Sequence, residues 1–128
     1  TQVQDAVGVR VICGFLDDVY KAAAFLEDRP EVEVRKRKDY IAYPKPNGYR
    51  SLHLILRLHA GPGAGMTVEV QLRTIALDFW ATLEHQLKYK QEIAHEALIR
   101  GELKRCADEI ASVDLSMQTI RELLTESF

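Results

Sequence analysis

Cysteine and long apolar runs are scarce in this sequence, and their scarcity excludes several kinds of protein. Cys13 and Cys106 are the two cysteines among 128 residues. Each stands in a pattern typical of a small buried side chain, so neither a disulfide nor a ligand role is expected. The four histidines lack the spacing and the cysteine neighbours of a zinc site. No apolar run reaches the roughly 18 residues of a membrane span, and no signal peptide is recognisable. We therefore expect a cytoplasmic protein with no membrane partner.

Charge of one sign prevails only in a short segment. Residues 35–50 hold six basic side chains and one acidic side chain, a balance of +5 within a chain whose net charge is −2. A basic island in an otherwise acidic chain indicates a local anion site and argues against a broad nucleic-acid surface. Taken alone, the cluster at residues 35–38 is equally typical of a solvated strand end.

Hydrophobic periodicity predicts alternating strands and helices in one domain. Strands are expected at residues 7–13, 31–36, 51–58 and 67–72, where β-branched residues cluster or apolar and polar residues alternate. Helices are expected at residues 17–29, from residue 75 to 87, and from 94 to 127, with Gly101 as a candidate break. The order β-α-β-β-β-α-α predicts an α+β fold, with a mixed, largely antiparallel β-sheet followed by C-terminal helices.

An apolar stripe runs along the last predicted helix. Its members are three or four residues apart, which is a narrow, heptad-like pattern. Such a stripe suits packing on one partner helix or on another subunit, so a homo-oligomer (a tetramer or dimer) formed through helices is expected. The stripe consists of Leu103, Ala107, Ile110, Val113, Met117, Ile120 and Leu124.

Two carboxylates near the predicted strands are candidates for cation binding. Asp5 precedes the first strand, and Glu69 lies within the last strand on the face opposite its apolar residues. Mg²⁺ is commonly held by one or two carboxylates together with water and phosphate, although a solvated strand face explains the same spacing. Arg10, inside the valine-rich first strand, is expected to pair with one of these carboxylates or to bind a triphosphate. Gln71 and Arg73 continue the polar face from Glu69.

The segment at residues 43–53, Tyr-Pro-Lys-Pro-Asn-Gly-Tyr-Arg-Ser-Leu-His, predicts a stiff turn. Its prolines restrict the backbone, and the Asn-Gly pair tolerates positive φ. The turn would present Tyr49 with Lys45 and Arg50 beside it. A purine base can stack on such a ring while the cations bind phosphate. The alternative is an ordinary loop whose Tyr49 packs on the core.

Two further side chains are candidates with open alternatives. His53 lies on the strand expected to pair with the Glu69 strand, where it either contacts phosphate or ribose or is a satisfied sheet histidine. Asp78 falls in the first turn of a predicted helix, where a carboxylate suits the helix dipole and could also face a ligand.

Several segments agree with one known family in order and spacing. They are residues 5–10 (Asp-Ala-Val-Gly-Val-Arg), 38–41 (Lys-Asp-Tyr-Ile), 44–53 in the turn, and 68–74 (Val-Glu-Val-Gln-Leu-Arg-Thr). Together they resemble the synthetase domain of the RelA/SpoT family. The segment Phe-Trp-Ala-Thr-Leu-Glu-His at residues 79–85, followed by Tyr89-Lys90, is similar to the small, single-domain alarmone synthetases of that family.

The resemblance implies a nucleotidyltransferase-like fold and an Mg²⁺-dependent GTP diphosphokinase. Such an enzyme transfers the β,γ-pyrophosphate of ATP to the ribose 3′-hydroxyl of GDP or GTP. By the same resemblance Asp5 and Glu69 hold Mg²⁺, and Glu69 helps to deprotonate the attacking hydroxyl. Arg10 reaches the ATP phosphates, and Gln71 completes the catalytic candidates.

The acceptor site follows from the same resemblance. Tyr49 stacks on guanine, and Asp78, where relatives often carry Asn or Asp, helps to select guanine over adenine. Lys38 stands at a position where the family also uses arginine. The implied guanine-nucleotide site comprises Lys38, Lys45, Asn47, Tyr49, Arg50, His53, Gln71 and Asp78.

One departure from the family concerns ATP. The family's basic ATP-binding segment precedes the motif at Asp5, whereas four residues precede Asp5 here. We expect residues 1–92 to form a synthetase core lacking that segment, with a helical extension at 93–128, so that the chain alone is truncated or incompletely active. No hydrolase domain is recognisable, and no alarmone hydrolysis is expected. The alternative class is a non-catalytic guanine-nucleotide or RNA-binding regulatory module with single-stranded RNA as partner.

Overall fold

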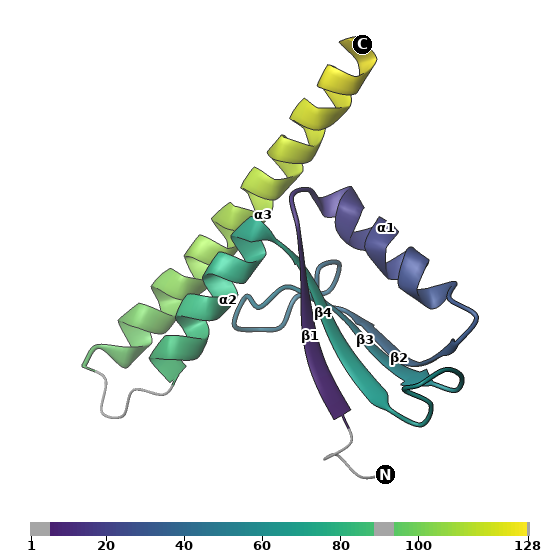
Figure 1. Cartoon of the computed structure of the whole chain (residues 1–128). Coiled ribbons are helices and arrows are strands. Elements are labelled where there is room, and N and C mark those ends of the chain that lie inside the picture. Colours follow the sequence, from purple (N-terminus) through teal and green to yellow (C-terminus); the bar gives the residue numbers. More distant parts are fainter. Residues whose placement is uncertain (1–5, 89–93, 128) are drawn as a thin grey trace.

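The computed structural model describes residues 6–88 and 94–127, and its elements follow the predicted order (Figure 1). The four strands form one sheet in the order β1-β4-β3-β2, in which β1 and β4 are parallel and the other neighbours antiparallel. This confirms the α+β class with a mixed, largely antiparallel sheet. The elements are β1 (Ala6–Cys13), α1 (Leu16–Glu27), β2 (Val32–Asp39), β3 (Leu52–Leu58), β4 (Thr67–Thr74), α2 (Ile75–Lys88) and α3 (Glu96–Ser127).

The core lies between α1 and one face of the sheet. Leu52, Leu54 and Leu56 alternate along β3 and pack against β4 and α1. Side chains alternate between the two faces of a strand, so β3 and β4 turn His53 and Gln71 to the opposite face. The burial of the leucines thereby determines which polar residues are presented together.

The second strand is longer than the predicted 31–36. Its pairing with β3 shifts register between Val34 and Lys36, and the strand then continues to Asp39. A β-bulge of this kind interrupts the alternation of side chains. The periodicity therefore ended before the strand did, and the continuation brings Lys38 beside His53.

The expected break at Gly101 is wrong, because α3 is one continuous helix of 32 residues. A glycine inside a helix costs about 1 kcal/mol relative to alanine, which the surrounding contacts can offset. Arg100 and Glu96 form an ion pair across the preceding turn, and the Trp80 indole donates to the Leu103 carbonyl at 2.7 Å just after it. Packing on α2 thus outweighs the local preference.

Helix α3 contacts the rest of the domain at several points. It runs beside α2 and continues past α1 (Figure 1). Thr74 Oγ1, at the junction of β4 and α2, accepts from the Leu77 amide and donates to the buried Asp114 carboxylate at 2.7 Å. Arg121 pairs with Asp18 of α1 at 2.7 Å. The predicted boundary between residues 92 and 93 lies outside the described residues.

The apolar stripe of α3 divides into two parts. Leu103, Ala107 and Ile110 pack against Trp80 of α2, which confirms that a partner helix covers the first part. The second part stays between 42% and 54% exposed: Val113, Met117, Ile120 and Leu124. No helix in residues 6–88 or 94–127 is long and apolar enough to cross a membrane.

Candidate nucleotide site

A row of polar side chains crosses the sheet face opposite α1. Lys38 of β2 pairs with His53 of β3, His53 pairs with Gln71 of β4, and Gln71 pairs with Arg10 of β1. Residues that pair across neighbouring strands lie side by side on one face. Four predicted site residues, one from each strand, therefore form a continuous row that we call the polar row.

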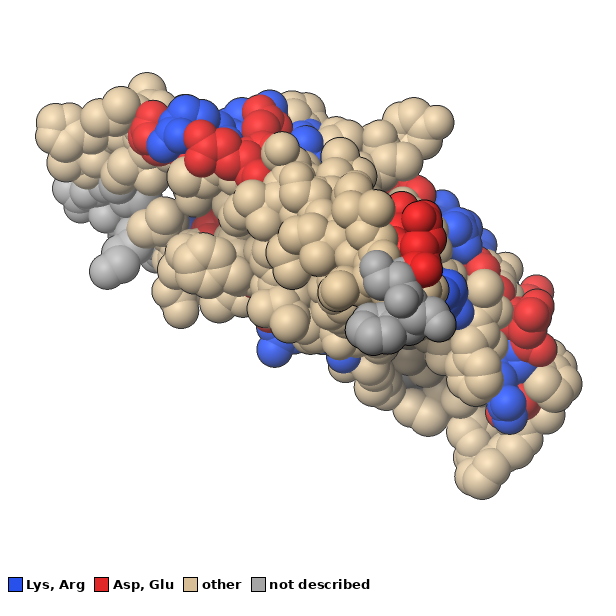
Figure 2. Space-filling view, turned by 90° about the horizontal axis from the view of Figure 1, so that it is seen from above, with Lys and Arg blue, Asp and Glu red and all other residues tan. Residues whose placement is uncertain are grey.

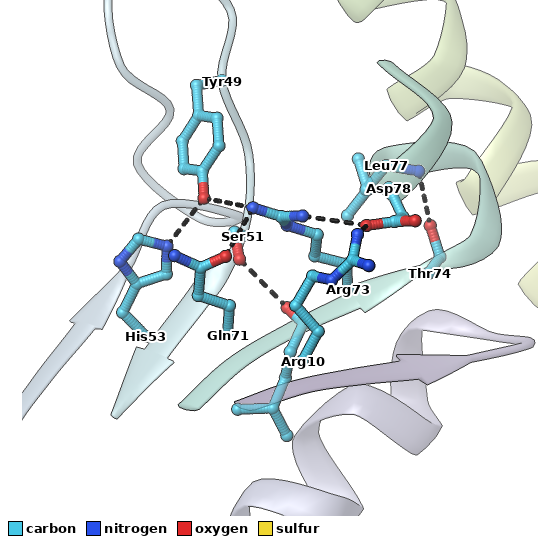
Figure 3. Close-up of polar contacts among 10 residues, drawn as sticks. Arg10, Tyr49, Ser51, His53, Gln71, Arg73, Thr74, Leu77 and Asp78 are labelled. Atoms are coloured by element: carbon cyan, nitrogen blue, oxygen red, sulfur yellow. Dashed lines mark hydrogen bonds and ion pairs between the residues drawn. The ribbon is translucent and has the colours of Figure 1, made fainter. Parts of the chain in front are cut away.

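Arg73 connects the polar row to the turn and to α2 (Figure 3). Its Nη2 group donates to the Tyr49 hydroxyl at 2.8 Å and to Gln71 Oε1 at 2.7 Å. Its Nη1 group donates to Asp78 Oδ1 at 2.8 Å. One guanidinium group thus joins side chains from a loop, a strand and a helix.

Arg10 is paired with Asp78, and not with Glu69, which was one of the two carboxylates that the sequence offered as its partner. Arg10 Nη1 donates to Asp78 Oδ1 at 3.1 Å, the same oxygen that accepts from Arg73. Two guanidinium groups share one carboxylate, so the cluster keeps a net positive charge. The Arg10 side chain is 57% exposed and can also reach an anion, while Asp5, the other expected partner, lies outside the described residues.

Tyr49 belongs to an aromatic cluster at the edge of the polar row. Its hydroxyl lies 2.8 Å from His53 Nε2, and the Tyr40 ring meets Tyr49 and His53 edge-on. The Lys45 ammonium group lies 4.9 Å from the Tyr40 ring centroid and 5.3 Å from that of Tyr49. Lys45 thus lies beside Tyr49 as expected. The second cation over the ring is Arg73, whose guanidinium carbon lies 5.5 Å from the ring centroid, and not the expected Arg50.

His53 is held in its neutral form. Burial, followed by the nearby positive charges of Arg73, Lys45 and Lys38, lowers the pKa of His53 from 6.5 to about 4. At neutral pH the ring therefore has one donor nitrogen and one acceptor nitrogen. A neutral imidazole can accept a hydrogen bond from Tyr49 and donate another to a ligand.

The lowered pKa of His53 predicts a loss of stability in mild acid. Below pH 6.5 the unfolded chain binds a proton that the folded chain excludes until about pH 4, so the free energy of unfolding falls as the pH drops through this window. Urea unfolding at pH 7.5 and pH 5 should show a larger loss for the wild type than for His53→Gln. Burial raises the pKa of Asp114, which acts in the opposite direction but equally in both proteins. Equal losses of stability in the two proteins would contradict the assignment of this pH dependence to His53.

Glu69 lies on the same sheet face as the polar row and is exposed. Among the described residues its carboxylate has no hydrogen-bond or ion-pair partner. Its neighbour on β1 is Gly8, and nothing lies within 4 Å of the position a Cβ would take there. An unpaired carboxylate beside open space fits a hydrated cation, because Mg²⁺ retains several waters.

Asn47 and Arg50 are directed toward the backbone of the turn and toward α3. The Asn47 side chain accepts from the Tyr49 amide at 2.9 Å, as expected for an Asx turn. Arg50 donates to the Gly48 carbonyl at 3.3 Å and to Asp108 of α3 at 3.2 Å, and its side chain is only 15% exposed. In this structure both residues shape the turn, and their contacts with a nucleotide stay a prediction.

Two hollows flank the turn. A pocket of about 170 Å³ lies over the polar row and is lined by Lys36, Lys38, Tyr40, His53, Glu69 and Gln71, among others. A larger hollow of about 580 Å³ lies between α2, α3 and residues 46–47. The smaller pocket is lined by the predicted site residues Lys38, His53, Glu69 and Gln71. The larger one is lined by Asn47 and by no residue of the polar row.

Two residues of the site had no role assigned from the sequence. Arg73 was recognised only as part of the polar face of its strand, and its contacts with Tyr49 and Asp78 depend on tertiary structure. The alternation of Glu69, Gln71 and Arg73 was the available signal. Tyr40 carried none beyond its place in the segment at residues 38–41.

The fold and site define a class of protein: a mixed α+β domain whose sheet face gathers cations, an amide and an aromatic ring suited to a phosphorylated, planar ligand. The chain belongs to the RelA/SpoT family, because the family model described as the region found in RelA / SpoT proteins matches residues 1–94.

Similar proteins agree with this membership. GTP pyrophosphokinase YwaC of Bacillus subtilis is 40% identical over 123 residues, which cover 94% of this chain and 59% of the relative. The crystal structure of small alarmone synthetase 2 from Bacillus subtilis has a TM-score of 0.80 at 40% identity, covering 90% of this chain and 64% of that one. Small alarmone synthetase 1 from the same organism, bound to its product pppGpp, has a TM-score of 0.78 at 34% identity, covering 91% and 60%. The chain thus spans about three-fifths of the length of these curated relatives.

Proposed function

We propose that this chain is the acceptor-binding and catalytic core of an alarmone synthetase, a GTP diphosphokinase. It would transfer the β,γ-pyrophosphate of ATP to the 3′-hydroxyl of GDP or GTP, giving ppGpp or pppGpp. The observation that carries the proposal is the polar row, from Lys38 through His53 and Gln71 to Arg10, with Glu69 on the same face. The family membership and the similarity to GTP pyrophosphokinase YwaC support it.

The chain's own residues would act mainly by positioning and by charge. Phosphoryl transfer depends on alignment and electrostatic stabilisation more than on a covalent nucleophile. Tyr49 offers an aromatic face to the guanine base, and Lys38 and Lys45 neutralise phosphate. Arg10, exposed at the edge of the polar row, would contact the ATP phosphates.

Mg²⁺ is part of the proposal. Glu69, unpaired among the described residues and next to Gly8, would hold the ion together with Asp5. Bound Mg²⁺ supplies neutralisation of the charge that develops on the transferred phosphates. Glu69 would also accept the proton of the attacking 3′-hydroxyl.

Replacing Tyr49 by alanine tests acceptor binding in this chain directly. Stacking of a base on an aromatic ring contributes about 1–3 kcal/mol, so GDP affinity measured by calorimetry should fall about 5- to 150-fold. Tyr43→Ala is a matched control, because Tyr43 is 79% exposed and belongs to none of the described contacts of the site. Unchanged GDP affinity in Tyr49→Ala, or equal losses in both variants, would contradict a guanine site here.

We also propose a homo-oligomer, a dimer or tetramer, formed through α3. The support is the exposed second part of the stripe, where four apolar side chains lie at helical spacing on the helix that extends past α1 (Figure 1). Unpaired apolar faces of this kind mark interaction surfaces. A monomeric mass by light scattering at micromolar concentration would contradict the proposal.

Single-stranded RNA stays a second candidate partner. On the face seen in Figure 2, basic groups lie next to acidic groups and between uncharged areas, which does not favour a broad phosphate-binding surface. The synthetase is the better supported function because of the polar row and the family membership. Tight RNA binding that is steeply salt-dependent and insensitive to Tyr49→Ala would favour the regulatory alternative.

A further inference from the structure

We propose that Arg73 is a positioning residue of the nucleotide site. It holds the Tyr49 ring and, through the tyrosine hydroxyl, keeps His53 in the tautomer that carries its proton on Nδ1. The inference rests on the proposed function, because its consequences are measured as binding of a guanosine diphosphate. In this role Arg73 orders Tyr49 and His53 in the nucleotide-free site.

The contacts of Arg73 are directed toward the site. Only 6% of the residue is exposed, and each hydrogen bond of its side chain ends on a candidate site residue: Tyr49, Gln71 or Asp78. Its Nε atom is buried and has no partner among the described residues. Buried donors are almost always paired, yet here Nε is left without a partner while both Nη groups bind candidate site residues. This orientation of the guanidinium connects three side chains of the site (Figure 3).

The direction of the hydrogen bonds follows from chemistry. A guanidinium group only donates, so the Tyr49 oxygen accepts from Arg73. A hydroxyl that accepts a charge-assisted bond becomes a stronger donor, and its proton is then available to His53 Nε2, 2.8 Å away. If Nε2 accepts, the proton of the neutral ring resides on Nδ1.

This tautomer gives His53 a defined role. The Nδ1–H group has no hydrogen-bond partner among the described residues, so it can donate to a ligand in the pocket that His53 lines with Lys38 and Gln71. A phosphate or ribose oxygen of a nucleoside diphosphate is an acceptor of suitable chemistry. The series of hydrogen bonds from Arg73 through Tyr49 to His53 thus couples the Tyr49 ring, which stacks on the base, to a hydrogen-bond donor for the same ligand.

Tyr49→Phe tests the series of hydrogen bonds from Arg73 to His53 while keeping the aromatic ring. Nitrogen-15 NMR of the wild-type chain should show His53 protonated on Nδ1, and the variant should show both tautomers. GDP affinity by calorimetry should fall about three- to tenfold, as expected for the loss of one hydrogen-bonded link, whereas Tyr49→Ala should lose more. A shift of the tautomer is a result that a purely structural role of Tyr49 would not produce.

Arg73→Lys tests the first member of this series of hydrogen bonds. Lysine keeps the charge but lacks the planar fork that serves several partners at once. We expect about a tenfold loss of GDP affinity and a mixture of His53 tautomers. Arg57→Met is the matched control, because Arg57 lies on the same sheet face in β3, four residues beyond His53, and it should change neither readout. If the Arg73→Lys variant does not fold, the results for Tyr49→Phe alone test the positioning role.

The outcomes separate the inference from the proposed function. No GDP binding by the wild type, or full binding by Tyr49→Ala, would overturn the proposed function. Loss of binding in Tyr49→Ala with wild-type affinity in Tyr49→Phe and Arg73→Lys would overturn only the positioning role. Protonation of wild-type His53 on Nε2 would also overturn it.

Discussion

The Glu69→Gln variant is expected to lose pyrophosphate transfer by a factor of about 10²–10⁴, the usual effect of removing a general base. Glutamine has the same shape but carries no charge and accepts no proton. The side chain is exposed and unpaired among the described residues, so the free energy of unfolding should change by less than about 0.5 kcal/mol. A large loss of turnover without a loss of stability would identify chemistry at Glu69.

The assay uses ATP, GDP and Mg²⁺ with both the chain itself and an N-terminally extended form. GDP affinity without Mg²⁺ should be at least as high in Glu69→Gln as in the wild type, because the neutral amide does not repel phosphate as the carboxylate does. The control is Glu33→Gln, a carboxylate change elsewhere in the same sheet, in β2. Wild-type turnover by Glu69→Gln, or no ppGpp from the extended wild type, would reject the synthetase.

The order of elements and the faces of the strands were predictable because they depend on local patterns. Alternation in β4 assigned Glu69 and Gln71 to the polar face, and the register confirms that they lie there with His53. Burial of the leucine face determines which residues lie on the opposite face, because a shift of the strand register by one residue would expose the leucines. The polar side of the site was therefore implicit in the hydrophobic pattern.

The partners of the charged groups were not predictable in the same way. Arg10 pairs with Asp78, 68 residues later, and this pairing depends on how α2 leaves the end of β4. Asp78 stands in a first helical turn, where the helix dipole already explains a carboxylate. No periodicity distinguishes that explanation from a pairing with two arginines, so the contact required the structure.

The continuity of α3 shows a second limit of local patterns. Gly101 lowers helix propensity, but the contact of Trp80 in α2 with Leu103, just after the glycine, belongs to tertiary packing. The same packing carries Ala107 to the turn at residues 44–53. The position of Tyr49 thus depends on Ala107 of α3, which is more than fifty residues away in the sequence.

Gly48→Ala is expected to disturb the packing of the turn against α3. Gly48 has a φ of +100°, and an added Cβ would lie 2.7 Å from the Ala107 Cβ and 3.2 Å from Lys104 Cδ. The backbone strain costs about 1–2 kcal/mol, and the overlap adds about 1–3 kcal/mol. Ala107 cannot rotate away because its Cβ is fixed to the helix backbone, so the turn itself must move.

Gly61→Ala separates the two contributions. Gly61 also has a positive φ, +84°, but nothing lies within 4 Å of its added Cβ. In urea unfolding, the free energy of unfolding of Gly61→Ala should therefore fall only by the backbone strain, about 1–2 kcal/mol. Its GDP affinity should stay unchanged. Gly48→Ala should lose about twice as much stability or more. It should also bind GDP about tenfold more weakly, because Tyr49 moves with the turn.

A second substitution tests where the overlap acts. Ala107→Gly removes the atom that the new Cβ meets, although glycine inside α3 costs about 1 kcal/mol by itself. Combined with Gly48→Ala, it should restore most of the GDP affinity while leaving the stability below that of the wild type. If Gly48→Ala binds GDP as Gly61→Ala does, the turn does not depend on α3. If the double variant stays as weak as the single one, strain at Gly48 acts on Tyr49 without the contact to Ala107.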